Sequence, residues 1–165
     1  MVIKRPPFLT KPYSAYHHRE VPEEDPLVAH IGPGSPAGEY LRLFWQPVIY
    51  SHELKDLPVR IRRFGEDLVA FRDKSGHIGL IELHCNHRGT SLEYGKIEEH
   101  GVRCCYHGWL FDVVGRILDT PLEPPDSTLK DRLCHGAYPV KEFNGIAFAY
   151  MGPPEVMPEF PAFDL

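Results

Sequence analysis

From about residue 57 the sequence alternates between apolar and polar positions in short runs that are separated by turn residues. PVRIRRFGEDLVAFR is followed by the turn residues 73–76 and then by HIGLIEL, which predicts antiparallel hairpins. VRCCYHGWLFDVVGRILD predicts another strand pair, with its turn near Gly115-Arg116. VKEF and IAFAYM flank Asn144-Gly145, which suits a type I′ turn. The pattern therefore predicts a mainly β domain built from antiparallel sheets.

The N-terminal part of the chain and a later proline-rich segment have a different pattern. Residues 1–36 are rich in proline and charge, which predicts an extended, poorly packed arm. A short helix should follow, since Ser35 can cap it, Pro36 suits its first position and Pro47 can end it. PLEPPDSTLKDRL predicts a proline-rich loop late in the chain.

Composition narrows the class of protein. A chain of 165 residues with a net charge of −5 is most simply one domain and is a poor candidate for binding nucleic acid. It has no apolar run of transmembrane length and no signal peptide at its start, so we expect a cytoplasmic protein that does not bind membranes. Four cysteines are too few for a disulfide scaffold, which makes them candidate metal ligands or small core residues.

Two short motifs combine cysteine with histidine. HCNHRGTS contains Cys85 and His87, and CCYHGW contains Cys104 and His107, with sixteen residues between His87 and Cys104. Each motif lies where a strand pair should turn, and each has a glycine close by. Two such loops from neighbouring hairpins can approach one another and enclose a metal centre.

Two metal centres suit two thiolates and two imidazoles. Zinc binds Cys2His2 sets tetrahedrally, usually with both cysteines on one loop and both histidines on another segment. A Rieske [2Fe-2S] cluster has two cysteines on one iron and two histidines on the other. One Cys and one His per loop favours the Rieske cluster, while a structural zinc module remains a distant alternative.

The motifs CNHRG and CYHGW resemble the paired motifs of the Rieske domain in Rieske non-haem iron oxygenases. The likeness extends over about residues 30–160 and is to the N-terminal part of phthalate 4,5-dioxygenase-like large subunits. It implies that Cys85 and Cys104 bind one iron, and that His87 and His107 bind the other. The family more often has proline at position 86, where this chain has asparagine, and an apolar residue at position 105, where it has cysteine.

The resemblance also implies a division of the chain. Residues 1–36 would be the arm, 37–160 the Rieske domain, and 161–165 a truncated link toward an absent catalytic domain. Full oxygenases hold a mononuclear Fe(II) through a D-x2-H-x4-H run, which this sequence lacks. We therefore expect that iron only in a missing domain, and no catalytic residues in this chain.

The function that the resemblance implies is electron transfer within an aromatic ring-hydroxylating dioxygenase system of aromatic hydrocarbon catabolism. A reductase or ferredoxin would donate electrons, and the oxygenase catalytic domain would accept them. The full-length protein would form a homotrimer. The alternative is a free-standing Rieske ferredoxin, so whether the chain is itself an enzyme stays open.

The sequence also predicts the reduction potential of the cluster. Respiratory Rieske proteins have a disulfide across the cluster, whose cysteines would stand at Thr90 and Tyr106 here. They also place two hydroxyls against the cluster sulfurs, where this chain has Trp109 and Phe111. Since hydrogen bonds to sulfur stabilise the reduced cluster, their absence predicts a potential near the low end of the Rieske range, about −150 mV.

The neighbours of the motifs have simpler interpretations. His84 is interpreted as a polar strand residue, and Cys105 and Cys134 as small buried residues. Arg88 is expected to anchor its loop, and Trp109 to shield the cluster from water. The acidic side chains between the motifs are interpreted as a solvated face or a contact for the reductase: Glu93, Glu98 and Glu99.

Overall fold

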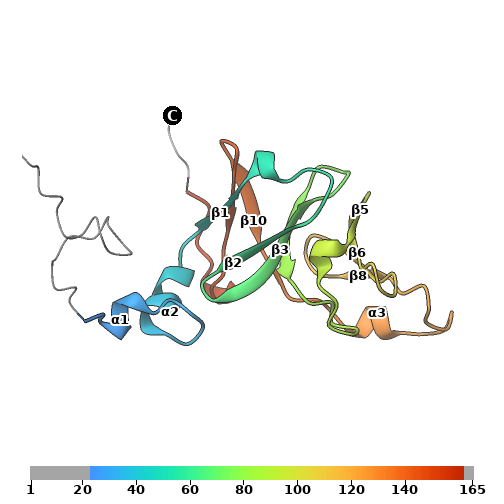
Figure 1. Cartoon of the computed structure of the whole chain (residues 1–165), viewed down its shortest axis with the longest axis horizontal. Coiled ribbons are helices and arrows are strands. Elements are labelled where there is room, and N and C mark those ends of the chain that lie inside the picture. Colours follow the sequence, from blue (N-terminus) through green and yellow to red (C-terminus); the bar gives the residue numbers. More distant parts are fainter. Residues whose placement is uncertain (1–22, 162–165) are drawn as a thin grey trace, which may run out of the picture.

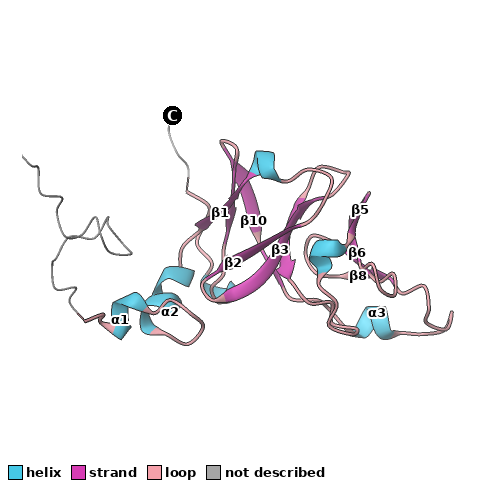
Figure 2. Ribbon diagram, viewed as in Figure 1, coloured by secondary structure: helices cyan, strands magenta, loops and turns pink. Residues whose placement is uncertain are grey.

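The computed structural model of the protein describes residues 23–161, which form three antiparallel sheets (Figures 1 and 2). The first has the order β1-β11-β10: β1 (Gln46–Tyr50), β11 (Ile146–Ala149) and β10 (Val140–Phe143). The second has the order β2-β3-β4-β9: β2 (Val59–Arg63), β3 (Glu66–Arg72), β4 (Ile78–Glu82) and β9 (Ala137–Tyr138). The third follows the chain: β5 (Lys96–Glu98), β6 (Gly101–Arg103), β7 (Leu110–Phe111) and β8 (Ile117–Asp119). The predicted fold class, mainly β with antiparallel sheets, is confirmed.

The predicted hairpins are present. Asn144 and Gly145 join β10 to β11 with φ angles of +47° and +77°, as a type I′ turn requires. Phe64 and Gly65 join β2 to β3 in the same way, with φ angles of +47° and +79°. A positive φ is unusual for a phenylalanine, which explains why the sequence pattern did not mark this turn.

The short N-terminal helix begins as predicted and ends earlier. It is α2 (Pro36–Arg42), and the Ser35 hydroxyl accepts a hydrogen bond from the Gly38 N–H at 3.2 Å. The prediction that Pro47 ends the helix is wrong, because Pro47 lies inside β1. It is tolerated there since β1 is an edge strand whose register shifts between Pro47 and Ile49.

Two further helices lie in segments predicted to be irregular. The arm contains α1 (Pro26–Ala29), and the proline-rich loop contains α3 (Leu129–Arg132). Each has only four residues, too few for an apolar periodicity to mark it. The expected arm before residue 23 and the end of the link, 162–165, lie outside the described residues. Among residues 23–161 there are also three single 3-10 turns: η2 (Ser51–Glu53), η3 (Leu92–Tyr94) and η4 (Pro154–Val156). Among residues 23–161 no helix is long and apolar enough to cross a membrane.

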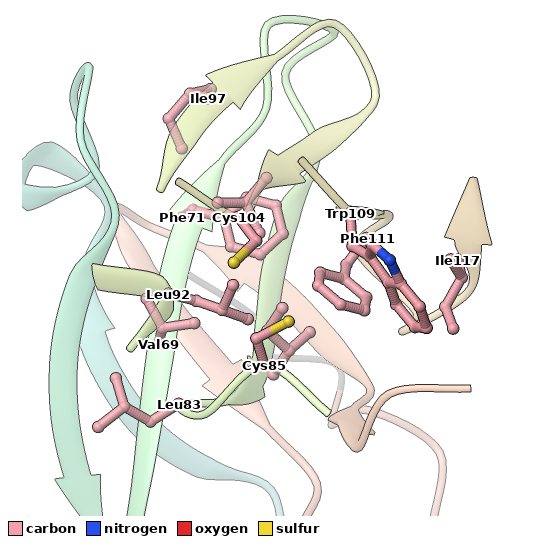
Figure 3. Packing of buried hydrophobic residues seen from close by; sticks show 12 residues of the cluster. Val69, Phe71, Leu83, Cys85, Leu92, Ile97, Cys104, Trp109, Phe111 and Ile117 are labelled. Carbon is pink, nitrogen blue, oxygen red and sulfur yellow. The ribbon is translucent and has the colours of Figure 1, made fainter. Parts of the chain in front are cut away.

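Strand β3 connects two hydrophobic cores. Because successive side chains of a strand point to opposite faces, Leu68 and Ala70 pack into one core while Val69 and Phe71 pack into the other. All four are almost completely buried, so this strand is apolar on both faces. The first core lies between the first two sheets, and the second lies between β3, β4 and the third sheet. Figure 3 shows the second core, which includes Cys85 and Cys104.

A polar network joins α2 to the second sheet. The Arg42 side chain is 6% exposed, pairs with the Glu66 carboxylate and donates to the Phe64 carbonyl at 2.9 Å. The Tyr138 hydroxyl donates to the other Glu66 oxygen at 2.5 Å. Burial, together with the neighbouring Glu66 carboxylate, raises the pKa of Tyr138 to about 12. The network therefore fixes the helix to β3 and β9.

His135 is a buried histidine outside both motifs. Its ring contacts Phe111 at 4.6 Å between centroids, and its Nε2 lies 2.8 Å from the Glu82 carbonyl oxygen. Burial lowers the pKa of His135, because desolvation outweighs the attraction of the Glu82 carboxylate for the charged form. Its Nδ1 is buried with no hydrogen-bond partner. The neutral imidazole is therefore the form that suits this position.

We predict that Glu66→Ala lowers the free energy of unfolding by about 3 kcal/mol, because it leaves the Arg42 guanidinium buried without its carboxylate. Urea denaturation followed by circular dichroism measures the change. The control is Glu142→Ala, which removes a more exposed ion pair with Arg72 and should cost less than about 1 kcal/mol. Equal losses in the two variants would contradict the prediction.

We also predict that the parent protein loses stability as pH falls below about 6.5, because the unfolded His135 takes up a proton that the folded one resists. The loss from this residue is at most about 1.4 kcal/mol per pH unit. Unfolding measured between pH 7 and 5 should therefore show a shallower dependence on pH in His135→Gln. Identical slopes for both proteins would show that His135 does not contribute.

Candidate metal centre

The first motif forms a closed loop directly after β4. The Cys85 N–H donates to the Thr90 carbonyl at 2.9 Å, and the Gly89 N–H donates to the Cys85 carbonyl at 2.7 Å. Gly89 has a φ of +73°, a conformation that glycine adopts without strain. A bridge between His84 and Ser91 pairs the two ends of the loop. The loop thus presents the Cys85 and His87 side chains from a fixed backbone.

The second motif forms the same loop between β6 and β7. The Cys104 N–H donates to the Trp109 carbonyl at 2.8 Å, and the Gly108 N–H donates to the Cys104 carbonyl at 3.1 Å. Gly108 has a φ of +76°, and a Cβ atom there would lie 2.8 Å from Pro121. The two loops therefore share one hydrogen-bonding pattern, in which the fourth residue after the cysteine has to be glycine.

The two cysteines predicted to be ligands, Cys85 and Cys104, lie together in the second core. Both are buried, and Figure 3 shows their sulfur atoms in the same cluster as Val69, Phe71 and Leu92. Burial raises the pKa of the Cys85 thiol to about 11, and the neighbouring Cys104 thiol adds to the effect. Backbone hydrogen bonds from residues 87 and 88 to Cys85 act in the opposite direction. A positive metal centre at this point would stabilise the thiolates that burial disfavours.

The two histidines predicted to be ligands lie together at the surface side of the loops. The rings of His87 and His107 are 4.6 Å apart between centroids, and both side chains are partly exposed. Burial and the neighbouring His107 lower the pKa of His87, which favours the neutral imidazole that binds metals. The Nδ1 atom of His87 is buried and has no hydrogen-bond partner. An iron bound at this nitrogen would satisfy it.

The four side chains form two pairs, cysteine with cysteine and histidine with histidine. Among residues 23–161 no three Cys, His, Asp or Glu side chains are placed to hold one metal ion together. A tetrahedral zinc site needs four ligands about one ion. A Rieske cluster needs two protein ligands on each of two irons, which is the donor set that these pairs supply. The residues present therefore fit a [2Fe-2S] cluster.

Aromatic side chains cover the histidine pair. Trp109 is buried and stacks on His87 with 4.7 Å between ring centroids and 1° between the planes. The Trp109 and Phe111 ring centroids are 6.4 Å apart, and Phe111 is also buried. Tyr106 lies 3.8 Å from the His107 ring and is largely exposed. Trp109 thus lies directly against a ligand ring, where a residue that excludes water from the centre would have to be.

Two of the interpretations of neighbouring residues are wrong. Cys105 and Cys134 are exposed rather than buried. In the second loop Cys104 takes the position facing the core, and its neighbour Cys105 is left on the outer side. At the other site His135 occupies the buried position, and Cys134 precedes it at the surface. All four cysteines are free.

The polar neighbours of the first loop also differ in part from expectation. His84 is exposed, as expected for a residue that is not a ligand. Arg88 is exposed and forms no ion pair with another of residues 23–161. The Asn86 side chain instead donates to the Cys134 carbonyl at 3.0 Å, joining the loop to the segment after α3.

The acidic residue Glu98 does not belong to a solvated face. Its carboxylate pairs with Arg103, the residue directly before Cys104. The sequence analysis did not single out Arg103. The sequence offered one signal for it: Arg103 directly precedes Cys104 and follows Glu98 by five residues. The contacts of Arg103, however, depend on how the third sheet folds.

Comparison with known proteins gives the same assignment as the geometry. Residues 44–144 match the Rieske [2Fe-2S] domain family. The chain is 54% identical over 155 residues to the tert-butanol monooxygenase / tert-amyl alcohol desaturase oxygenase subunit of Aquincola tertiaricarbonis, covering 92% of this chain and 33% of that protein. It is 42% identical over 142 residues to the phthalate 4,5-dioxygenase oxygenase subunit of Pseudomonas putida, covering 84% of this chain and 32% of that protein. The chain thus spans about a third of the length of these curated relatives.

Solved structures share the fold. NdmA of Pseudomonas putida CBB5 matches with a TM-score of 0.66 at 26% identity, over 76% of this chain and 39% of that one. Dicamba monooxygenase matches with a TM-score of 0.67 at 23% identity, over 76% of this chain and 40% of that one. These matches cover the larger part of the described residues.

We predict that Cys85→Ser and His107→Ala each abolish the brown-red colour of the purified protein, because each removes one of two protein ligands to an iron. Absorbance in the visible range and iron content per chain measure the loss. The matched controls are Cys105→Ser and His84→Ala, which change exposed neighbours and should keep the colour. A coloured His107→Ala, or a colourless Cys105→Ser, would contradict the ligand assignment.

Proposed function

Because the chain belongs to the Rieske [2Fe-2S] domain family, we propose that it transfers one electron at a time through a cluster held by Cys85, Cys104, His87 and His107. Its relatives include oxygenase subunits of a phthalate dioxygenase and of a tert-butanol monooxygenase. The proposal therefore places the chain in an oxygenase system and gives it the role of electron carrier.

The observation that carries this proposal is the separation of the four proposed ligands into a cysteine pair and a histidine pair at two depths. The cysteine pair lies in the second core, and the histidine pair lies toward the surface. A bound cluster supplies a reversible one-electron couple. The chain contributes the rest: two buried cysteines, two neighbouring imidazoles, and the Trp109 ring packed against His87.

The partners follow from this orientation. The histidine side is the partly exposed side, so it is where an electron can enter or leave over a short distance. We propose that the donor is a reductase or ferredoxin and that the acceptor is the mononuclear iron of an aromatic ring-hydroxylating oxygenase. Since the chain spans only about a third of its relatives, residues 37–160 would be the Rieske portion of such a protein, and the full-length protein would form a homotrimer.

The proposed potential follows from the side chains around the loops. Trp109 and Phe111 stand where hydroxyl donors to the cluster sulfurs would be needed, and neither side chain carries a hydroxyl. Fewer hydrogen bonds to sulfur leave the reduced, more negative cluster less stable. The centre should therefore be a weak oxidant, suited to passing electrons onward to an oxygen-activating iron.

We predict that the protein takes up one electron per chain at about −150 mV. An anaerobic reductive titration, followed by electron paramagnetic resonance and visible absorbance, measures the stoichiometry and the midpoint. A protein that shows no iron–sulfur signal would contradict the proposed function. A signal with a midpoint well above 0 mV would support the cluster and contradict the low-potential role.

A further inference from the structure

We propose that Arg103 is a positioning residue that fixes the second ligand loop through the Gly108 carbonyl, and thereby sets the geometry of the metal centre. The inference rests on the proposed function, because it assigns Arg103 a role toward the bound cluster. Arg103 is the last residue of β6 and directly precedes Cys104. It is not one of the four ligands.

The guanidinium of Arg103 uses all three of its nitrogens. Nε and Nη2 donate to the two Glu98 carboxylate oxygens at 3.0 and 3.2 Å. Nη1 donates to Asp119 Oδ2 at 2.7 Å and to the Gly108 carbonyl at 2.6 Å. Glu98 ends β5 and Asp119 ends β8, so one side chain joins both outer strands of the third sheet to the ligand loop.

The Gly108 peptide units are consequently held on both sides. The Gly108 N–H donates to the Cys104 carbonyl at 3.1 Å, while the Gly108 C=O accepts from Arg103. Gly108 lies between the ligand His107 and Trp109, which stacks on the ligand His87. A rotation of this backbone would therefore move both His107 and the ring that packs against His87.

Within residues 23–161 no guanidinium makes an equivalent contact with the first loop. His84 stands before Cys85, in the position that Arg103 occupies before Cys104, and its side chain is exposed. The shared pattern of backbone hydrogen bonds closes both loops, so it does not explain why the second loop also needs a guanidinium. The second loop lies between two short strands, β6 with three residues and β7 with two. Because such short strands have few ladder hydrogen bonds to hold the loop, the contact with Arg103 adds to them.

The surroundings of Arg103 favour a geometric role over a purely electrostatic one. Two carboxylates, those of Glu98 and Asp119, face its single positive charge. The planar fork of arginine can bind a carboxylate with two nitrogens and still reach a carbonyl. Lysine keeps the charge but cannot make these bonds together.

The test is Arg103→Lys in the full chain with its cluster. The matched control is Arg72→Lys. Arg72 also binds a carboxylate with two nitrogens, Glu142 at 2.9 and 3.0 Å, and a glycine carbonyl, Gly76 at 3.0 Å. It lies on the face of β3 opposite to Phe71, away from the ligand loops.

Three measurements compare the variants at equal cluster loading: the g-values of the reduced cluster, its midpoint potential, and the rate at which a chelator bleaches the visible absorbance. We expect Arg103→Lys to shift the g-values and the potential and to speed cluster loss about 10-fold, as for other residues that orient metal ligands. We expect Arg72→Lys to leave all three at the parent values. Either a silent Arg103→Lys or an equal change in Arg72→Lys would overturn the role.

Two outcomes keep this test separate from the proposed function. A parent protein with no Rieske signal overturns the proposed function, whereas a parent with the signal and an unchanged Arg103→Lys overturns only the role of Arg103. If Arg103→Lys does not fold, Glu98→Gln decides, because it weakens one side of the fork and leaves Arg103 in place. A shift of its g-values and potential away from those of the parent protein supports the role, and parent-like spectra overturn it.

Discussion

The packing of β3 between two hydrophobic cores is the constraint on which the rest of the structure depends. Leu68 and Ala70 pack between the first two sheets, while Val69 and Phe71 pack against the third sheet. Cys85 and Cys104 belong to that second core, so the same burial that stabilises the domain brings the two ligand loops together. Metal binding and folding would therefore be linked, because the Cys85 thiol, whose pKa burial raises, would become a thiolate when a metal bound it.

Two arginines connect segments at the edge of the hydrophobic cores to the sheets. Arg42 joins α2 to the second sheet, and Arg103 joins the second ligand loop to the third sheet. Each guanidinium combines a carboxylate with a backbone carbonyl, which apolar contacts cannot supply with the same direction. Since both side chains are largely removed from water, these bonds are less screened than those on the open surface.

The local features of the molecule could be predicted from the sequence, and the long-range ones could not. Asn144-Gly145 specifies its turn by itself, and the spacing within each motif identifies Cys85, His87, Cys104 and His107 as candidate ligands. Their division between two irons came from a family resemblance. The exposure of Cys105 and Cys134 depends on which neighbour faces the core. The link from Arg103 to Asp119 spans sixteen residues and exists only once β6 to β8 have paired.

The depth of the two proposed ligand pairs determines which side of the domain the proposed electron transfer would use. Val69, Phe71 and Leu92 cover the cysteine side, so an electron leaving there would have to cross the packed core. The histidine side is partly exposed, with Tyr106 against His107 at the surface and Trp109 behind His87. A donor and an acceptor would thus meet the same side of the domain, and they would have to contact it in turn or approach separate histidines. Trp109 stacks with its plane parallel on His87 and not on His107, so the two histidines have different surroundings. This difference favours the arrangement in which donor and acceptor approach separate histidines.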